Sequence, residues 1–503
     1  MKKNMRLNMV FVVVSFVLFA FTACSNDSSE KEETMGNLLT ASVAEIDLDA
    51  GGGGTNVTIE TTADSWTLTN TGSSWAKVSK VLGYKGATII QVTALENTTG
   101  VTRTANLTII ADNTEEVKIT VSQLSKEVEV PGLFPSYNVN PIAADASGMS
   151  STAVQLAAKI KLGWNIGNAL EATGGETAWG NPKTTKALID LVKANGFNAI
   201  RIPCSWNQNL SNSNKAEIST VWLNRVKEVV QYCIDNEMYV LINIHWDGGW
   251  LENNVTEEQK EANNAKQKAF WEQIATHFRE FDEHLLFASA NEPNVEDATQ
   301  MTVLTSYHQT FIDAVRSTGG KNAYRTLVIQ GPTTDIEKTK ELMTILPIDT
   351  VTNRMMVEVH YYGPWTFAGL TKDESWGKMF YYWGTGFHST TDVERNATYG
   401  EEADLEKNFK LMKTQFVDKG IPVLLGEFGA IRRTTLTGDD LILHLASRAY
   451  YLKTVVKQAK ANGLLPFYWD EGSTGNNGFG IFKRSDNTVF DAQALNALLD
   501  GLK

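Results

Sequence analysis

Cysteine is scarce in this chain: Cys24, Cys204 and Cys233 are the three cysteines among 503 residues. Three cysteines cannot make a disulfide framework, so a small disulfide-stabilised fold is excluded and stability must come from a hydrophobic core. Cys24 has a separate explanation, given below. We expect Cys204 and Cys233 to be free, buried thiols.

Basic charge and the usual metal and phosphate motifs are also lacking. Lys and Arg number 45 against 58 Asp and Glu, and the net charge of −13 argues against nucleic acid as a ligand. The glycine run 51–54 is not followed by Gly-Lys-Ser/Thr, so it reads as a loop and not as a phosphate site. No HExxH or comparable spacing surrounds His245, Asp247 or His360, and we expect neither a metal nor another cofactor.

The N-terminus carries a targeting pattern. The basic stretch "MKKNMR" precedes the apolar run "VFVVVSFVLFAF", which suits a signal peptide but is short for a membrane span. "TAC" places Cys24 where bacterial lipoproteins are cut and acylated, although Phe21 replaces the usual Leu. We expect a signal peptide over residues 1–23 and a lipoprotein tethered to the outer membrane, at the cell surface, through lipid on Cys24. The alternative is a plain signal peptide with a chance cysteine.

A short tether and a small β domain are expected next. Residues 24–38 are polar and small, as in a flexible tether. Residues 39–126 contain alternating runs such as "NVTIET" and "VKITVSQ" between Gly- and Asn-rich breaks, which predicts an all-β sandwich. This segment resembles the BACON-type domain found ahead of glycan-degrading enzymes in gut bacteria, a resemblance that implies carbohydrate binding. Because only Trp66, Trp75 and Tyr84 could stack on sugars, and both Trp lie at strand-like positions, we expect a spacer.

The rest of the chain alternates between strand-like and helical runs. Residues 127–144 contain three prolines and predict a semi-rigid linker. In residues 145–503, eight strand-like runs, from "IKLGWNIGN" to "LPFYWD", alternate with helical segments. This pattern predicts an α/β fold, the (β/α)8 TIM barrel. An open doubly wound sheet would need a GxGxxG turn after the first strand, which "GWNIGNALEA" lacks.

Two predicted barrel strands end in an acid. The fourth, "HLLFASANEP", delivers Glu292, and the seventh, "PVLLGEFG", delivers Glu427. Because barrel active sites lie at the carboxyl ends of the strands, the two carboxylates should face each other across the mouth. A facing pair is what glycoside hydrolysis needs, with retention at about 5 Å and inversion at a wider spacing that admits water.

Other strand ends also carry polar or aromatic side chains. These are Arg201 on the second strand, His245 on the third, His360 and Tyr362 on the sixth and Trp469 on the eighth. Each residue alone is often structural. Their coincidence at the ends of several strands favours one shared site.

Six motifs carry a family resemblance. "RIP", "NIHWDG", "SANEP", "EVHYY", "LLGEFG" and "YWD" occur in the order and spacing of glycoside hydrolase family 5, over residues 145–503. "GWNIGNALEATGGETAWGNP" resembles its subfamily 4, which holds endo-β-1,4-glucanases, including xyloglucan-specific ones. With the lipoprotein pattern and the BACON-type domain, the whole chain resembles surface xyloglucan-specific glucanases of gut bacteria.

The resemblance implies a role for each motif residue. Glu427 would be the nucleophile, and Glu292 the general acid and then the general base. Arg201 and Tyr362 would hold Glu427 ionised and oriented. Asn291 would bond the 2-hydroxyl of the sugar in the −1 subsite.

The same resemblance places His245 and His360 along the −1 subsite and Trp469 beneath its sugar as a stacking floor. Trp246 stands where relatives often have a second His, which changes the wall beside His245. Since the acid Glu292 must be protonated near neutral pH, we expect burial and a negative neighbour to raise its pKa.

Aromatic side chains are candidates for sugar stacking. A long aromatic loop in a compact barrel is usually functional, and one follows the sixth strand; the alternative is a loop packed on itself. Its candidates are Trp365, Trp376, Tyr381, Tyr382 and Trp383, and further candidates are Trp179, Trp206 and Trp250.

The expected function is that of a monomeric, retaining endo-β-1,4-glucanase acting on a plant β-glucan, with xyloglucan as the leading substrate. The same chemistry on cellulose, mixed-linkage glucan or mannan is an alternative. A non-catalytic surface glycan-binding protein is a second alternative, against which the two acids weigh.

Overall fold

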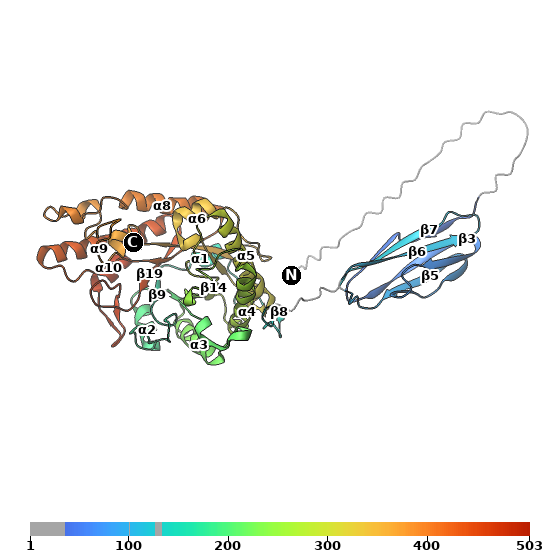
Figure 1. Ribbon diagram of the computed structural model, residues 1–503, viewed down its shortest axis with the longest axis horizontal. Coiled ribbons are helices and arrows are strands. Elements are labelled where there is room, and N and C mark those ends of the chain that lie inside the picture. Colours follow the sequence, from blue (N-terminus) through green and yellow to red (C-terminus); the bar gives the residue numbers. More distant parts are fainter. Residues whose placement is uncertain (1–35, 100, 126–132) are drawn as a thin grey trace, which may run out of the picture. The chain divides into compact units, whose positions relative to one another are not determined.

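The computed structural model describes residues 36–99, 101–125 and 133–503 (Figure 1). The predicted signal peptide, its Cys24 and most of the tether lie outside these residues. In the described part, none of the helices combines the length and apolar character needed to cross a bilayer. The chain divides after Val130 into two compact units.

The first unit is all-β, as predicted. Its strands form one hydrogen-bonded sheet in the order β2-β7-β6-β3-β5-β4, with β1 paired to β3. Side chains alternate along the strands, so that Val57, Ile59 and Trp66 of β3 enter a core shared with β6 and β7. The strands are β1 (Leu39–Ala41), β2 (Glu45–Leu48), β3 (Gly53–Asn70), β4 (Ala76–Val78), β5 (Leu82–Ala94), β6 (Arg103–Ala111) and β7 (Val117–Gln123).

The aromatic residues of this unit serve mainly in packing. Trp66 is buried, and the guanidinium of Arg103 lies 4.6 Å from the centre of the half-buried Trp75 ring. Tyr84 is therefore the one exposed aromatic ring in the described residues of this unit.

The second unit contains a closed barrel of eight parallel strands, which confirms the (β/α)8 prediction. The strands follow one another around the barrel in sequence order, and the helices lie outside them (Figure 1). The barrel strands are β9 (Gly163–Ile166), β10 (Ala199–Ile202), β13 (Tyr239–Asn243), β14 (Leu285–Ala288), β16 (Leu327–Gln330), β17 (Met355–Tyr361), β18 (Val423–Phe428) and β19 (Leu464–Asp470).

Ten α-helices, eight short 3-10 helices and three short strand pairs complete the described part of this unit. The helices are α1 (Ala153–Ala157), α2 (Lys186–Ala194), α3 (Thr220–Ile234), α4 (Lys260–Phe278), α5 (Ala298–Ser317), α6 (Ile336–Leu342), α7 (Trp365–Ala368), α8 (Glu402–Gln415), α9 (Gly438–Ala461) and α10 (Ala492–Gly501). The pairs are β8 (Ile142–Ala144) with β15 (Gly319–Gly320), β11 (Leu210–Asn212) with β12 (Glu217–Ile218), and β20 (Phe482–Lys483) with β21 (Thr488–Val489).

Part of the predicted linker packs on the barrel. Glu272 on α4 accepts hydrogen bonds from the backbone N–H of Tyr137 at 2.6 Å and from the Ser136 hydroxyl at 3.0 Å. Strand β8 pairs with β15 further along. The described residues of the 127–144 segment therefore belong to the barrel unit.

The barrel strands are buried on both faces. On β14, Leu285 and Phe287 face the surrounding helices, while Leu286 and Ala288 face the barrel interior. This explains the unbroken apolar run, since a parallel strand between two cores has no polar face. Toward the carboxyl ends, the next inward positions are polar and fully buried: Asn165, Arg201, Asn243, Gln330 and Glu358. The candidate site is built from this polar layer and from the residues that follow it along the strands.

Gly163 provides a test of the packing inside the barrel. A Cβ at this position would lie 2.0 Å from the Phe467 ring, whereas a Cβ at Gly386 would meet no heavy atom within 4 Å. We predict that Gly163→Ala lowers the free energy of unfolding of the barrel by about 1–3 kcal/mol through overpacking. Gly386→Ala, the matched control, should change it by less than about 0.5 kcal/mol. Urea unfolding would measure both, and equal stability of the two variants would contradict the packing described.

Candidate active site

Strand alternation brings the candidate residues into the barrel mouth. On β17, Glu358 and His360 face the interior, and Tyr362 follows two residues later. Arg201 on β10 is inward and fully buried, like Asn291 just after β14. The sequence therefore assembles one site from strands that are distant along the chain.

The nucleophile candidate reaches the mouth through an irregularity in β18. Leu424 already faces the interior, so regular alternation would point Gly426 inward and Glu427 outward. The pairing register of β18 shifts against both neighbouring strands here, between Leu425 and Phe428. Such a bulge re-aims a side chain, and it turns Glu427 into the mouth.

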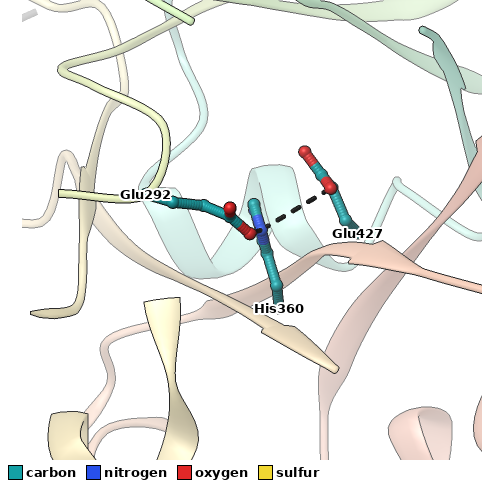
Figure 2. Close-up of side chains that lie close together, drawn as sticks. All are labelled: Glu292, His360 and Glu427. Atoms are coloured by element: carbon teal, nitrogen blue, oxygen red, sulfur yellow. Dashed lines mark hydrogen bonds and ion pairs between the residues drawn. The ribbon is translucent and has the colours of Figure 1, made fainter. Parts of the chain in front are cut away.

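The two acids lie close together. Oxygen atoms of Glu292 and Glu427 and a ring nitrogen of His360 all lie within 4.8 Å of one another, with His360 between the acids (Figure 2). Retaining glycosidases space their carboxyl groups by about 5–5.5 Å and inverting ones by about 6.5–9.5 Å. An oxygen pair within 4.8 Å lies on the retaining side of this division.

Glu427 is held from two sides. Arg201 Nη1 donates to its Oε1 at 2.8 Å, and the Tyr362 hydroxyl donates to its Oε2 at 2.9 Å. Its side chain is 7% exposed. Arg201 Nη2 also donates to Asn291 Oδ1 at 2.7 Å, so one guanidinium orients both residues.

Glu292 is more open. Its side chain is 42% exposed, and its Oε1 lies 2.7 Å from His360 Nδ1. The Thr334 hydroxyl lies 3.4 Å from the same oxygen. Its backbone N–H donates to Glu252 Oε1 at 2.8 Å, which fixes the loop that carries it.

The pKa expected for Glu292 is wrong for the free protein. Burial raises the pKa, as expected, but the hydrogen bond and charge of His360, with Arg201, outweigh burial and lower it. For Glu427, burial outweighs His360 and Arg201 and raises the pKa. His360, whose Nδ1 lies 2.7 Å from Glu292 Oε1, is the neighbour that can hold the proton expected on Glu292.

His360 is the cation between the acids. Burial disfavours its charged form, but Glu427, Glu292 and Glu358 outweigh burial and raise its pKa to about 10. His245 is the opposite case, since burial and then the charges of Arg201 and His360 hold its pKa well below the usual value. Its neutral ring lies parallel to Trp469, with ring centres 6.0 Å apart.

Several residues of the site were missed by the sequence reading. Glu358 pairs with Arg201 Nε at 2.8 Å, and Asn165 Oδ1 accepts from Arg201 Nη1 at 3.0 Å. Burial raises the pKa of Glu252, which lies under Glu292, to about 7. The spacing of two between Glu358 and His360 could have placed Glu358 on the same face.

The aromatic candidates divide by exposure. Trp206, Tyr382 and Trp383 are fully buried, so their expected role as stacking platforms is wrong. Trp206 donates to the Asn243 carbonyl and Trp383 to the Gly400 carbonyl, as packing residues do. The remaining candidates are half-buried or exposed, and the exposed ones are Trp179, Trp365 and Trp376.

A hollow of about 470 Å³ lies beside Glu292 and His360. Its wall includes Trp365 and Tyr399, whose rings are exposed by about half. Tyr399 packs edge-on against Phe380 with ring centres 5.3 Å apart, so its open face is held in place. Glu427 is not part of this wall.

Glu292, His360 and Glu427 are the one group of side chains in the described residues that could ligate a metal. However, His360 Nδ1 is engaged by Glu292 at 2.7 Å and Nε2 faces Glu358 at 3.3 Å. Both ring nitrogens therefore have protein partners. The geometry is that of a proton-sharing network.

A closed parallel barrel with two close carboxyls at its mouth is the arrangement of a glycoside hydrolase. Comparison with known families agrees: Cellulase (glycosyl hydrolase family 5) matches residues 165–475, and BACON, described as a putative N-terminal binding domain, matches residues 64–124. The chain belongs to glycoside hydrolase family 5, and it is an enzyme of that class.

Relatives match over most of the chain. The xyloglucan-specific endo-β-1,4-glucanase of Bacteroides ovatus is 35% identical over 97% of this chain and 96% of its own length. Endoglucanase A of Paenibacillus barcinonensis is 35% identical over 77% of this chain and 98% of its own.

Solved structures are similar as well. The family 5 xyloglucanase of Bacteroides ovatus, in complex with a XXXG heptasaccharide, has a TM-score of 0.68 at 34% identity, over 93% of this chain and 99% of that one. A xyloglucan-specific β-1,4-glucanase from a ruminal metagenomic library has a TM-score of 0.65 at 40% identity, covering 70% and 96%. A broad specificity endoglucanase from Bacteroides salanitronis has a TM-score of 0.63 at 34% identity, covering 72% and 98%.

The opposite titration of the two site histidines is testable. Because the pKa of His360 is raised to about 10, its imidazole should stay charged from pH 5 to about 9. His245, with its lowered pKa, should stay neutral over the same range. Nitrogen-15 NMR of protein labelled at its seven histidines would measure this, with His360→Gln and His245→Gln assigning the signals. A His360 ring that loses its proton near pH 6.5 would contradict the network described.

Proposed function

We propose that the enzyme is a retaining endo-β-1,4-glucanase that cleaves the backbone of plant xyloglucan. The observation that carries the proposal is the pair Glu292 and Glu427, with oxygens within 4.8 Å at the mouth of a family 5 barrel. The substrate rests on the xyloglucan-specific relatives, one of which matches both units of the chain.

In the first displacement, Glu427 attacks the anomeric carbon and forms a glycosyl ester as the bond to the leaving oxygen breaks. The leaving oxygen takes its proton from Glu292, which shares that proton with His360 across 2.7 Å. Arg201 and Tyr362 hold the attacking carboxylate, so little reorganisation is needed at the moment of reaction.

In the second displacement, Glu292 removes a proton from water, and the water oxygen attacks the anomeric carbon. The ester bond breaks, Glu427 is regenerated as a carboxylate, and the proton returns to the Glu292–His360 pair. The 42% exposure of Glu292 lets water reach it, whereas the 7% exposure of Glu427 keeps the nucleophile dry. We propose that Asn291, which Arg201 holds through a hydrogen bond of 2.7 Å, bonds the 2-hydroxyl of the −1 sugar.

The surroundings of the acids supply surfaces for sugar rings. Trp469, parallel to His245, would be the floor under the −1 sugar. We propose that the hollow lined by Trp365 and Tyr399, which lies beside Glu292, receives the leaving sugar. A volume of about 470 Å³ gives room for a branched sugar unit on that side.

Assays on a panel of polysaccharides would distinguish the proposed function from two alternatives. An enzyme on cellulose, mixed-linkage glucan or mannan would release reducing ends fastest from one of those polymers. A surface glycan-binding protein would bind xyloglucan and release none. We expect fastest release from xyloglucan, measured as new reducing ends, with product sizes showing cuts within the chain.

Loss of either acid should nearly abolish hydrolysis of xyloglucan, while circular dichroism stays unchanged. Glu292→Gln removes the proton donor, worth about 10²–10⁴-fold in rate. On aryl glycosides whose leaving group needs no proton, it should release the aryl group rapidly in the first turnover and then slowly, because the base of the second displacement is also lost. Glu427→Gln should be inactive on both substrates, because the nucleophile is gone. Proton NMR of the wild-type reaction should show the β-anomer forming first; normal turnover by Glu427→Gln would refute the assignment.

We further propose that the enzyme is a monomeric lipoprotein of the outer membrane, displayed at the cell surface. The support is the apolar run before Cys24 and the polar tether after it. The β-sandwich, with one exposed aromatic ring, suits a spacer between anchor and barrel.

The proposed lipid anchor can be tested with Cys24→Ser in a bacterial host, by lipid labelling and membrane location. The wild-type protein should incorporate labelled palmitate and sediment with outer membranes. The variant should incorporate no label and leave the membrane fraction. Cys233→Ser is the control, because that buried thiol lies on α3 in the barrel unit. Membrane fractionation with labelling measures both, and a labelled Cys24→Ser protein would disprove the anchor.

A further inference from the structure

Glu358 is a buried carboxylate for which the proposed mechanism has no role. It lies on β17 two residues before His360, so both side chains face the barrel interior. No part of Glu358 is exposed. A buried charge persists only where its partners compensate it, so the partners of Glu358 indicate what it does.

The partners of Glu358 are residues that hold the two acids. Arg201 Nε lies 2.8 Å from its Oε1, and His360 Nε2 lies 3.3 Å from the same oxygen. Gln330 Nε2 donates to its Oε2 at 2.6 Å. Burial raises the pKa of Glu358, but Arg201, His360 and Gln330 outweigh burial and lower it. The ionised carboxylate can only accept hydrogen bonds.

The backbone beside the nucleophile makes room for this carboxylate. Gly426 immediately precedes Glu427 at the irregularity of β18. A Cβ at Gly426 would lie 2.0 Å from Glu358 Oε1. The bulge that turns Glu427 into the mouth therefore also leaves the space that Glu358 fills.

We propose that Glu358 is a positioning residue for both catalytic carboxyls. Toward Glu427 it acts through Arg201, whose guanidinium it fixes and whose Nη1 holds the nucleophile at 2.8 Å. Toward Glu292 it acts through His360. Because Glu358 accepts a hydrogen bond from Nε2 at 3.3 Å, Nδ1 is left facing Glu292 at 2.7 Å, where the two groups share one proton. The inference rests on the proposed glycosidase function.

The charges around His360 set the sign of the expected effect. Glu292 faces it from the loop after β14, Glu427 from β18 and Glu358 from its own strand. Arg201 on β10, His245 after β13, Tyr362 after β17 and Glu252, which accepts from the Glu292 backbone, are further titratable groups nearby. Removing the negative charge of Glu358 lets His360 release its proton at lower pH. The Glu292–His360 pair then loses its shared proton earlier as pH rises.

The test is the pH profile of kcat and kcat/KM on xyloglucan for Glu358→Gln, which keeps the shape and removes the charge. We expect kcat to fall by about 10²-fold with KM little changed, since Glu358 does not touch substrate. The alkaline limb should move to lower pH by about one unit or more. Glu358→Asp keeps the charge, so its alkaline limb should stay at the wild-type pH.

Glu283→Gln is the matched control. Glu283 is also a buried glutamate, paired with Lys159 at 2.7 Å, but it precedes β14 at the opposite end of the barrel. Its loss should leave both limbs of the profile unmoved. An alkaline limb of Glu358→Gln that stays in place, or moves to higher pH, would overturn the inference.

Combining Glu358→Gln with His360→Gln tests whether Glu358 shifts the alkaline limb through His360. Removing His360 should move the alkaline limb down, to the value of Glu292 alone. It should also move the acid limb up, because the His360 cation lowers the pKa of Glu427. In this background Glu358→Gln should add no further shift of the alkaline limb. A full additional shift would overturn the route through His360.

One measurement needs no variant of Glu358. In the wild-type protein, nitrogen-15 NMR should find Nε2 of His360 protonated at every pH at which the enzyme is active. A neutral ring protonated at Nδ1 instead would overturn the inference even if Glu358→Gln fails to fold. Should Glu427→Gln and Glu292→Gln retain hydrolysis, the proposed function itself fails; should they be inactive while Glu358→Gln keeps the wild-type profile, only this inference fails.

Discussion

The buried ion pair between Arg201 and Glu358 is the interaction on which the site depends. Both side chains are fully buried in the middle of the barrel, at a distance of 2.8 Å. Two buried charges are stable only if their remaining donors and acceptors are satisfied. The other nitrogens of Arg201 reach Asn165, Asn291 and Glu427, so satisfying the pair assembles the site.

The two acids differ in exposure and in hydrogen-bond partners because they occupy different positions in the barrel. Glu427 lies within β18 and accepts hydrogen bonds from Arg201 and Tyr362, which hold its carboxylate in one position, as a nucleophile requires. Glu292 lies beyond the end of β14, where it meets both solvent and His360. One carboxyl is thus dry and fixed, and the other can exchange a proton with water.

Proton storage on His360 reconciles the lowered pKa of Glu292 with the proposed role of Glu292 as an acid. A carboxylate beside a cation resists protonation, yet the proton it needs is only 2.7 Å away. A sugar that enters the mouth displaces water and changes the balance between the two groups. The pair, and not Glu292 alone, is therefore the unit that titrates.

Much of the fold was predictable from residues. The eight apolar strand runs and the acids at two of their ends predicted the barrel and both carboxyls, because parallel strands buried on two faces leave no other pattern. The alternation predicted a helix after each strand, but helices α5 and α6 were not located: α6 is a short segment, Ile336–Leu342, and the buried face of α5 includes polar residues such as His308. The burial of Trp206 and Trp383 was also not predicted, because the sequence does not distinguish an aromatic residue in a core from one on a sugar-binding surface.

The sequence by itself determined most of the side chains that arrive at the barrel mouth, with Glu427 the exception, because a strand period of two sorts inward from outward residues. Only the tertiary structure decided how they act on one another. The register shift that turns Glu427 inward depends on pairing with β17 and β19. The charge of His360 depends on three carboxylates from different parts of the chain. Electrostatic interactions depend on distance and burial in space, and neither follows from spacing along a chain.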